Sequence, residues 1–382
     1  MLGAERSLDV AGVECYGRAE SFRHTLPGEV MEVGDGLPMD VRASARVMKS
    51  EETMTDATAG SFDETMWSGL LHGGHGGTFM GVPNIELDRD VIRASGTKAV
   101  VYGFPFDATT ISRSGANYGP RAIRETSVQF TNFQATYDFD LFAKLRLADG
   151  GDCKVALGNT VKTFERVEAD IAEIVAGGAI PVVFGGDHSV SIPVGKAAKR
   201  PGTSPGWVQF DTHLDAAPHV GGEELNHCCT ITRAVDNGYD PSKIVLVGIS
   251  GWMNPKTELK YCRDHGIRVI WLEDIWEHGA AWVVDQILER VGEDGFYLTF
   301  DVDSLDAAYA PGTCAPTPGG MTMREALEII RGISPAGLIG VDVAEALPAH
   351  DHSTRTQLIA ARVALEALAF HAGSPRTPVH VG

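Results

Sequence analysis

Short apolar runs alternate with amphipathic segments of helical length along most of the chain after residue 95. The runs are β-branched or aromatic and include "KAVVYGFPF", "AIPVVFGGDHS", "KIVLVGIS" and "FYLTFDVDS". Helix-like segments such as "TFERVEADIAEIVAGG" and "AWVVDQILERVGED" lie between them. Strands that are apolar throughout and joined by helices are typical of βαβ units, in which helices cover both faces of a parallel sheet. The pattern predicts a three-layer α/β/α fold with a mostly parallel central sheet.

The domain organisation follows from where this alternation begins. Residues 1–95 are rich in Gly, Asp, Glu, Met and Thr with little periodicity, which predicts an N-terminal extension or arm. Residues 96–382 are expected to form one catalytic domain. His72 and His75 flank two glycines within the extension, and we interpret "LLHGGHGG" as a glycine-rich loop rather than a metal site.

Charge and composition exclude several classes of partner. The net charge of −19 disfavours binding to a nucleic-acid backbone or an anionic membrane, whereas a small cation is compatible with it. No run of about twenty apolar residues occurs, and the start lacks a basic segment followed by an apolar one, so we expect a cytoplasmic protein. The chain has no CxxC pair, and its six cysteines are expected to be free thiols: Cys15, Cys153, Cys228, Cys229, Cys262 and Cys314.

Metal-binding side chains follow three of the predicted strands. In an open parallel sheet, ligands bind outside the carboxyl ends of the strands, where such side chains converge. In "FDTHLD" the two aspartates and the histidine alternate with other residues, so an extended chain presents all three on one face. The candidates are His188 in "GGDHS", Asp211, His213 and Asp215 in "FDTHLD", and Asp301 and Asp303 in "FDVDS".

Each candidate alone has an ordinary explanation, such as a loop histidine or an aspartate that caps a turn. Together they place several carboxylates in one buried crevice, where they would repel one another unless cations neutralised them. Oxygen-rich ligation with one imidazole per ion suits Mn²⁺, and Ni²⁺ or Co²⁺ are compatible. An EF-hand is excluded, because Leu305 and Asp306 stand where the calcium loop needs a ligand and a glycine. Two close metals can deprotonate a bridging water, which indicates metal-assisted hydrolysis.

These motifs resemble the four signatures of the ureohydrolases, the arginase and agmatinase family. They are "GGDHS", "DTHLD", "FDVDSLDAAYAPGTCAPTPGG" and "GVDVAEALP", and the resemblance runs from about residue 97 to 372. "GTFMGVPNIELD" is similar to the segment before the core of agmatinase-type members and favours that branch. The resemblance implies an arginase-like fold, two Mn²⁺ ions per subunit, release of urea and an amine from a guanidino group, and a homotrimer or homohexamer.

The resemblance also implies roles for individual residues. The six candidates above would be metal ligands, Glu345 would bind the guanidinium, and His227 would shuttle protons or contact substrate near the leaving amine. These roles fit the chemistry, since a guanidinium fork can donate two parallel hydrogen bonds to a carboxylate. The departing nitrogen must be protonated, and Asp303 is a suitable proton carrier. A buried structural histidine is the alternative interpretation of His227.

Three positions depart from the family pattern. Thr212 replaces an alanine and is expected to be a packing change only. Cys228 and Cys314 stand where members commonly have glycine, so both are expected to line the substrate pocket and to narrow it. We therefore favour guanidine or a short or N-substituted guanidine as the substrate over agmatine or guanidinobutyrate, and we expect Ni²⁺ in place of Mn²⁺ if the chain belongs to the guanidine-hydrolase branch. Trp252 and Tyr309 are candidates for an apolar or cation–π wall, or for core aromatics.

Two hypotheses from other classes remain at this point. A catalytically silent partner subunit would be expected to lack ligands, and none of the six is missing. A deacetylase of a related fold would keep a single zinc site and leave His188 and Asp303 without a role. Both are less consistent with the sequence than a two-metal hydrolase acting on a small cation.

Overall fold

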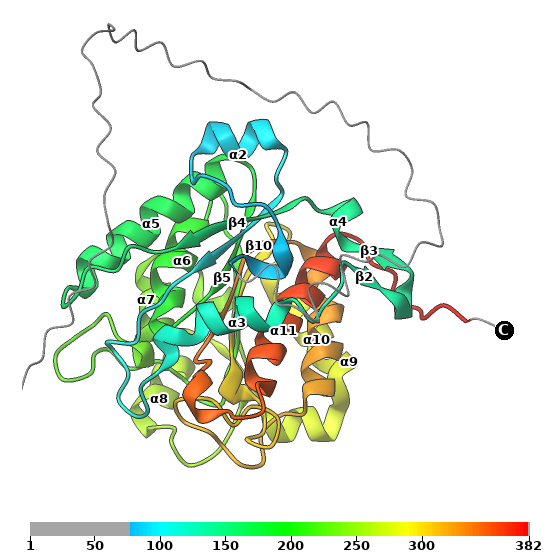
Figure 1. The fold of residues 1–382 in the computed structure, drawn as a ribbon. Coiled ribbons are helices and arrows are strands. Elements are labelled where there is room, and N and C mark those ends of the chain that lie inside the picture. Colours follow the sequence, from blue (N-terminus) through cyan, green and yellow to red (C-terminus); the bar gives the residue numbers. More distant parts are fainter. Residues whose placement is uncertain (1–76, 381–382) are drawn as a thin grey trace, which may run out of the picture. The chain divides into compact units, whose positions relative to one another are not determined.

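The central feature of the computed structural model, which describes residues 77–380, is an eight-stranded sheet (Figure 1). Its strand order is β4-β1-β5-β10-β9-β6-β7-β8, and every neighbouring pair is parallel. The strands are β1 (Ala99–Gly103), β4 (Leu147–Asp152), β5 (Ile180–Phe184), β6 (Gly206–Phe210), β7 (Ile244–Ile249), β8 (Arg268–Trp271), β9 (Phe296–Asp301) and β10 (Leu338–Ala344).

Helices cover both faces of this sheet (Figure 1). One face carries α2 (Arg89–Ser95), α5 (Thr160–Ala176), α6 (Ser191–Ala198), α7 (Thr230–Asp236) and α8 (Lys256–His265). The other carries α3 (Gly119–Ser127), α9 (Leu272–Val291), α10 (Met323–Ile333) and α11 (Arg355–His371). Each face of the sheet has its own hydrophobic core, and strand β1 contributes to both. Val100 and Tyr102 point into the core on the α5 side, and Ala99 and Val101 into the core on the α11 side. The predicted three-layer α/β/α fold is confirmed.

Local sequence signals explain where several helices begin. Thr322 and Glu325 form a capping box at the start of α10, and Asn159 caps α5 by accepting a hydrogen bond from the Lys162 amide. Helix α11 is the last helix of the described residues, and Val363 and Phe370 are among its buried residues. A short helix, α4 (Leu141–Lys144), and an antiparallel pair, β2 (Phe133–Gln134) and β3 (Phe139–Asp140), are the remaining α-helix and strands of the described residues, and short 3-10 helices lie between the elements.

The described part of the expected extension, residues 77–95, packs against the rest of the described chain. Phe79 is buried, and its amide donates a hydrogen bond to Asp149 Oδ2 at 2.8 Å, while Ile92 of α2 enters the core beside α5. His72 and His75 lie outside the described residues, so the interpretation of their loop and the boundary at residue 95 stay predictions. The described cysteines are free thiols, as expected. Between residues 77 and 380, no helix combines the length and apolarity needed to cross a membrane.

A buried ion pair joins α3 to the sheet edge and supplies a test of the fold. Arg124 Nε and Nη2 donate to the two oxygens of Asp149 at 2.8 and 2.9 Å, and both side chains are almost fully buried. Arg124→Met would leave the Asp149 carboxylate buried without its partner, so we expect a loss of about 3–5 kcal/mol in the free energy of unfolding. Urea unfolding measures this loss.

The matched control is Arg121→Met, one turn earlier on the exposed side of α3, where the pair with Glu125 is open to solvent. It should leave the unfolding midpoint nearly unchanged. The double variant Arg124→Met/Asp149→Asn should recover part of the loss. Equal midpoints for the Arg121 and Arg124 variants would contradict this account.

Candidate active site

The candidate site lies at the carboxyl ends of four neighbouring central strands. Strands β5, β10, β9 and β6 are adjacent in the sheet, and each is followed directly by one of the motifs found in the sequence. Because the strands are parallel, their carboxyl ends meet at one edge. The fold thus brings together all six predicted metal ligands and Glu345, although they are spread over more than 150 residues of chain.

The first group surrounds the imidazole of His188. Its Nδ1 lies 3.1 Å from Asp211 Oδ2, 3.0 Å from Asp215 Oδ2 and 3.2 Å from Asp301 Oδ2. All four residues are buried. Three carboxylate oxygens and one nitrogen therefore face a common point.

The second group surrounds His213 and shares a residue with the first. His213 Nδ1 lies 3.1 Å from Asp303 Oδ2 and 3.4 Å from Asp211 Oδ1. Asp211 thus presents one oxygen to each histidine, in the manner of a bridging carboxylate. The donors form two adjacent groups, each with a single imidazole nitrogen.

Tight local backbone conformations orient these carboxylates. The Asp303 amide donates to Asp301 Oδ1 at 2.8 Å, which directs the other oxygen of Asp301 towards His188. Asp215 and Glu345 have φ angles of 46° and 60°, in the left-handed region that residues other than glycine rarely adopt. Strained backbone of this kind concentrates at functional sites, where the surrounding structure holds it in place.

Residues behind His188 set which of its nitrogens faces the carboxylates. Thr299 Oγ1 donates to Asp342 Oδ1 at 2.9 Å and lies 2.9 Å from His188 Nε2. Since the threonine hydroxyl has a single proton, it accepts from Nε2–H, which leaves a lone pair on Nδ1. Nδ1 is buried among three carboxylates and has no hydrogen-bond partner. A cation fits this orphaned nitrogen, as metal-ligating histidines are usually held in this way from behind.

The electrostatics of the two groups agree with a requirement for cations. Burial raises the pKa of Asp301 well above its usual value, with Asp303 adding to the effect, and burial raises the pKa of Asp303 to about 6. Burial lowers the pKa of His188, but its carboxylate neighbours, Asp211 first, outweigh burial and raise it. Without metal, the groups would hold protons to limit their mutual repulsion, and divalent cations would replace those protons.

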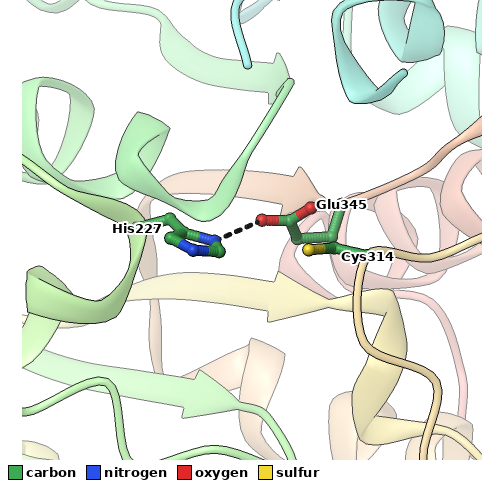
Figure 2. A group of neighbouring side chains, drawn as sticks. All are labelled: His227, Cys314 and Glu345. Atoms are coloured by element: carbon green, nitrogen blue, oxygen red, sulfur yellow. Dashed lines mark hydrogen bonds and ion pairs between the residues drawn. The ribbon is translucent and has the colours of Figure 1, made fainter. Parts of the chain in front are cut away.

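Glu345 and His227 form a second functional unit beside the metal ligands (Figure 2). Glu345 Oε1 accepts from the His188 amide at 2.9 Å and lies 3.0 Å from His227 Nδ1. The Ile111 amide donates to His227 Nε2 at 3.2 Å, so this contact makes Nδ1 the protonated nitrogen. Glu345 Oε2 is buried and has no partner. It is free to accept a donor from a ligand.

These groups open into a cavity of about 410 Å³. Cys228 and Cys314 both line it, as the sequence predicts. Its acidic lining residues are Asp215, Glu258, Asp301, Asp303 and Glu345. Among the described residues, no lysine or arginine lines the cavity, and its remaining polar groups include three histidines. The cavity therefore suits a small cation and offers no fixed positive charge to an anionic ligand.

The structure bears out neither interpretation of Trp252 and Tyr309, as a cavity wall or as core aromatics. Trp252 is entirely exposed, Tyr309 is 40% exposed, and neither lines the cavity within this chain. The loop after β7 instead directs the next residue, Met253, into the cavity. Thr212 behaves as expected, because its hydroxyl contacts Ser250 Oγ at 3.0 Å and it is absent from the cavity lining.

Sequence reasoning missed several residues that support the site. Asp187 is buried, and its Oδ2 accepts from both the amide and the hydroxyl of Thr109 at 2.9 Å, which ties the loop after β1 to the "GGDHS" turn. Its position beside His188 was a visible signal. No signal in the sequence pointed to Glu258, because α8 has the pattern of an ordinary amphipathic helix. Burial, followed by the charge of Asp215, raises the pKa of Glu258 to about 7.

Thr299 offers a test of the metal site that leaves every predicted ligand in place. Thr299→Val removes the acceptor of His188 Nε2–H, so metal affinity should fall about 10- to 100-fold. Competition with a chromogenic chelator measures this change. Thr163→Val is the matched control, because Thr163 is an equally buried threonine whose hydroxyl bonds only backbone atoms at the start of α5. An equal loss of affinity in both variants would rule out a specific role for Thr299.

Comparisons with known proteins agree with this geometry. The model of the Arginase family matches residues 97–369. A mitochondrial agmatinase from Gallus gallus is 36% identical over 276 residues, which cover 72% of this chain and 81% of the relative. A guanidinobutyrase from Pseudomonas aeruginosa is 32% identical and covers 78% of this chain and 93% of its own length. The solved proclavaminate amidino hydrolase of Streptomyces clavuligerus aligns with a TM-score of 0.72 and 30% identity, over 78% of this chain and 97% of that one. The chain therefore belongs to the arginase family, in its agmatinase-like branch, and is a metal-dependent amidinohydrolase.

Proposed function

We propose that this protein hydrolyses guanidine, or a short or N-substituted guanidine, to urea and ammonia or an amine. The observation that carries the proposal is the buried, unpartnered Oε2 of Glu345, a residue that lines the same cavity as members of both histidine–carboxylate groups. A guanidinium, which is a cation with N–H donors, fits such an oxygen.

We further propose that the six residues around His188 and His213 hold two divalent cations. His188, Asp215 and Asp301 would serve one ion, His213 and Asp303 the other, and Asp211 both. Held there, two divalent cations would supply hydroxide at neutral pH by lowering the pKa of a water. The oxygen-rich donor set, with one imidazole in each group, is compatible with Mn²⁺, and Ni²⁺ is the alternative for an enzyme that acts on guanidine itself.

The chain's own residues would then position the substrate and manage its protons. Glu345 accepts from the guanidinium at Oε2 and directs its central carbon towards the two metal groups. Asp303, whose Oδ2 lies 3.1 Å from His213 Nδ1, holds a proton for the departing nitrogen. His227 fixes Glu345 through its Nδ1 contact and exchanges protons with the open side of the cavity.

Size and charge of the cavity support the substrate class. The Cys314 thiol stands close to Glu345, and Cys228 lines the same cavity, so both occupy space beside the guanidinium. With Asp215, Asp301 and Asp303 neutralised by the cations, a substrate with a carboxylate tail would still face Glu258 and Glu345, and no lysine or arginine of the described chain. We therefore expect a lower kcat/KM for arginine and the guanidino acids than for guanidines whose tails are uncharged or cationic.

Agmatine is the second candidate, and one residue favours it. The Glu258 carboxylate lines the same cavity and is nearly buried, at a position suited to the ammonium of a guanidino-amine. The volume of about 410 Å³ leaves room for such a tail. Agmatine would then use both carboxylates, whereas guanidine would use Glu345 alone.

Urea release across a set of guanidino compounds tests the proposal directly. The protein is supplied with Mn²⁺ or Ni²⁺ and assayed on guanidine, dimethylguanidine, metformin, agmatine, arginine and guanidinobutyrate. We expect the highest kcat/KM for guanidine or an N-substituted guanidine, and the lowest values for the two substrates with a carboxylate. Highest activity on guanidinobutyrate would contradict the substrate class, and urea from none of the compounds would contradict the function.

Glu345→Gln and Glu258→Gln separate the two candidate substrates. Glu345→Gln should lower kcat/KM for every substrate about 10- to 100-fold, because a hydrogen bond to a charged group contributes about 1.5–3 kcal/mol. Glu258→Gln should raise KM for agmatine alone if its ammonium binds there, and should leave KM for guanidine unchanged. Metal content of both variants is checked by elemental analysis. Unchanged kcat/KM in Glu345→Gln would remove this residue from substrate binding.

The remaining expectations stay predictions. They are a cytoplasmic location, assembly as a homotrimer or homohexamer, and the boundary between extension and catalytic domain. Elemental analysis would also separate the alternatives from other classes. Two divalent ions per chain are expected for the proposed enzyme and one zinc ion for a deacetylase, whereas a silent subunit would release no urea from any guanidino compound.

A further inference from the structure

A third cluster of metal-binding groups lies at the expected position of the guanidinium, and it contains sulfur (Figure 2). It comprises His227 at the start of η5 (His227–Cys229), Cys314 in the loop between β9 and α10, and Glu345 after β10. One donor atom from each lies within 4.8 Å of the others, and all three residues are buried. The two catalytic groups offer only oxygen and nitrogen, so this cluster differs from them in chemistry.

We propose that this cluster binds a thiophilic divalent cation, Zn²⁺ or Cd²⁺, in addition to the two catalytic ions. If Glu345 binds the guanidinium as proposed above, this cation excludes the substrate. Thiolate and imidazole together select zinc-like ions over Mn²⁺, which prefers carboxylate and water. The enzyme would thus be inhibited by ions other than those that activate it.

The unsatisfied oxygen of Glu345 is an independent indication of a ligand at this point. Oε1 is already engaged by the His188 amide and by His227, but Oε2 is buried without any partner. Cys314 is held towards the cluster, because its Sγ lies 3.1 Å from Thr110 Oγ1, which itself donates to the Arg113 carbonyl. A carboxylate and a thiolate together would balance the charge of one divalent cation, with no lysine or arginine of the described residues in the lining to compete.

Binding exchanges protons for the metal and requires no oxidant or reductant. The Cys314 S–H bond breaks, its proton goes to solvent, and a sulfur–metal bond forms. The proton on His227 Nδ1 moves to Nε2 through solvent, which frees the Nδ1 lone pair for the cation. The Ile111 amide then loses its acceptor, and because Ile111 is 64% exposed at the cavity mouth, water can replace that contact.

Cadmium titration of the manganese-loaded full-length protein tests the site without depending on turnover. We expect a third ion per chain by elemental analysis, retention of both manganese ions, and the ultraviolet charge-transfer band of a cadmium–thiolate bond. All variants carry Cys15→Ser, so that the cysteine outside the described residues cannot contribute. Cys314→Ser should lose both the third ion and the band, whereas Cys228→Ser, which removes the other thiol of the cavity, should retain both.

A second variant and a binding competition complete the test. Glu345→Gln keeps the sulfur and should weaken cadmium binding, and low concentrations of guanidinium chloride should displace cadmium from the unsubstituted site. A band that persists in Cys314→Ser, or cadmium that only replaces manganese without a band, would overturn the proposal. If no guanidino compound yields urea but the band depends on Cys314, the cation site stands and the proposed function fails.

Discussion

Mutual repulsion among buried carboxylates is the constraint on which the site depends. Asp211, Asp215, Asp301 and Asp303 are all buried at one edge of the sheet, and only two imidazoles lie among them. The fold tolerates this concentration of charge only if protons or cations neutralise it. The orphaned Nδ1 of His188 favours cations, and the same requirement explains why Thr299 and Asp342 hold the imidazole from behind.

The fold and the metal ligands could be predicted because they depend on local patterns. Buried parallel strands can be recognised in the sequence as short apolar runs. His188, Asp211 and Asp301 lie at or shortly after the ends of such runs, so the parallel topology brings them together. The convergence of Glu345 and His227 came from the family resemblance rather than from any local pattern. Glu258 and Met253 could not be predicted, since whether a helix or loop residue faces a cavity depends on packing between distant elements. The prediction for Trp252 was wrong for the same reason. Its loop directs the neighbouring Met253 into the cavity and leaves Trp252 exposed.

The lining of the cavity constrains the charge of a ligand as well as its volume. Cys228 and Cys314 line the cavity, but a volume of about 410 Å³ remains. Outside the predicted metal ligands, the acidic lining residues are Glu258 and Glu345, and no lysine or arginine of the described residues is present to pair with an anionic tail. Cys314 adds a different property, since it brings sulfur into a region that otherwise offers oxygen and nitrogen.

Because Asp211 turns one oxygen towards each histidine, the two metal positions cannot act independently. An ion at either position would fix the carboxylate plane and thereby orient the second oxygen for its neighbour. By linkage, whatever change one ion makes in the affinity for the other is returned by the same factor. Metal loading would then be a property of the pair of positions rather than of either position alone.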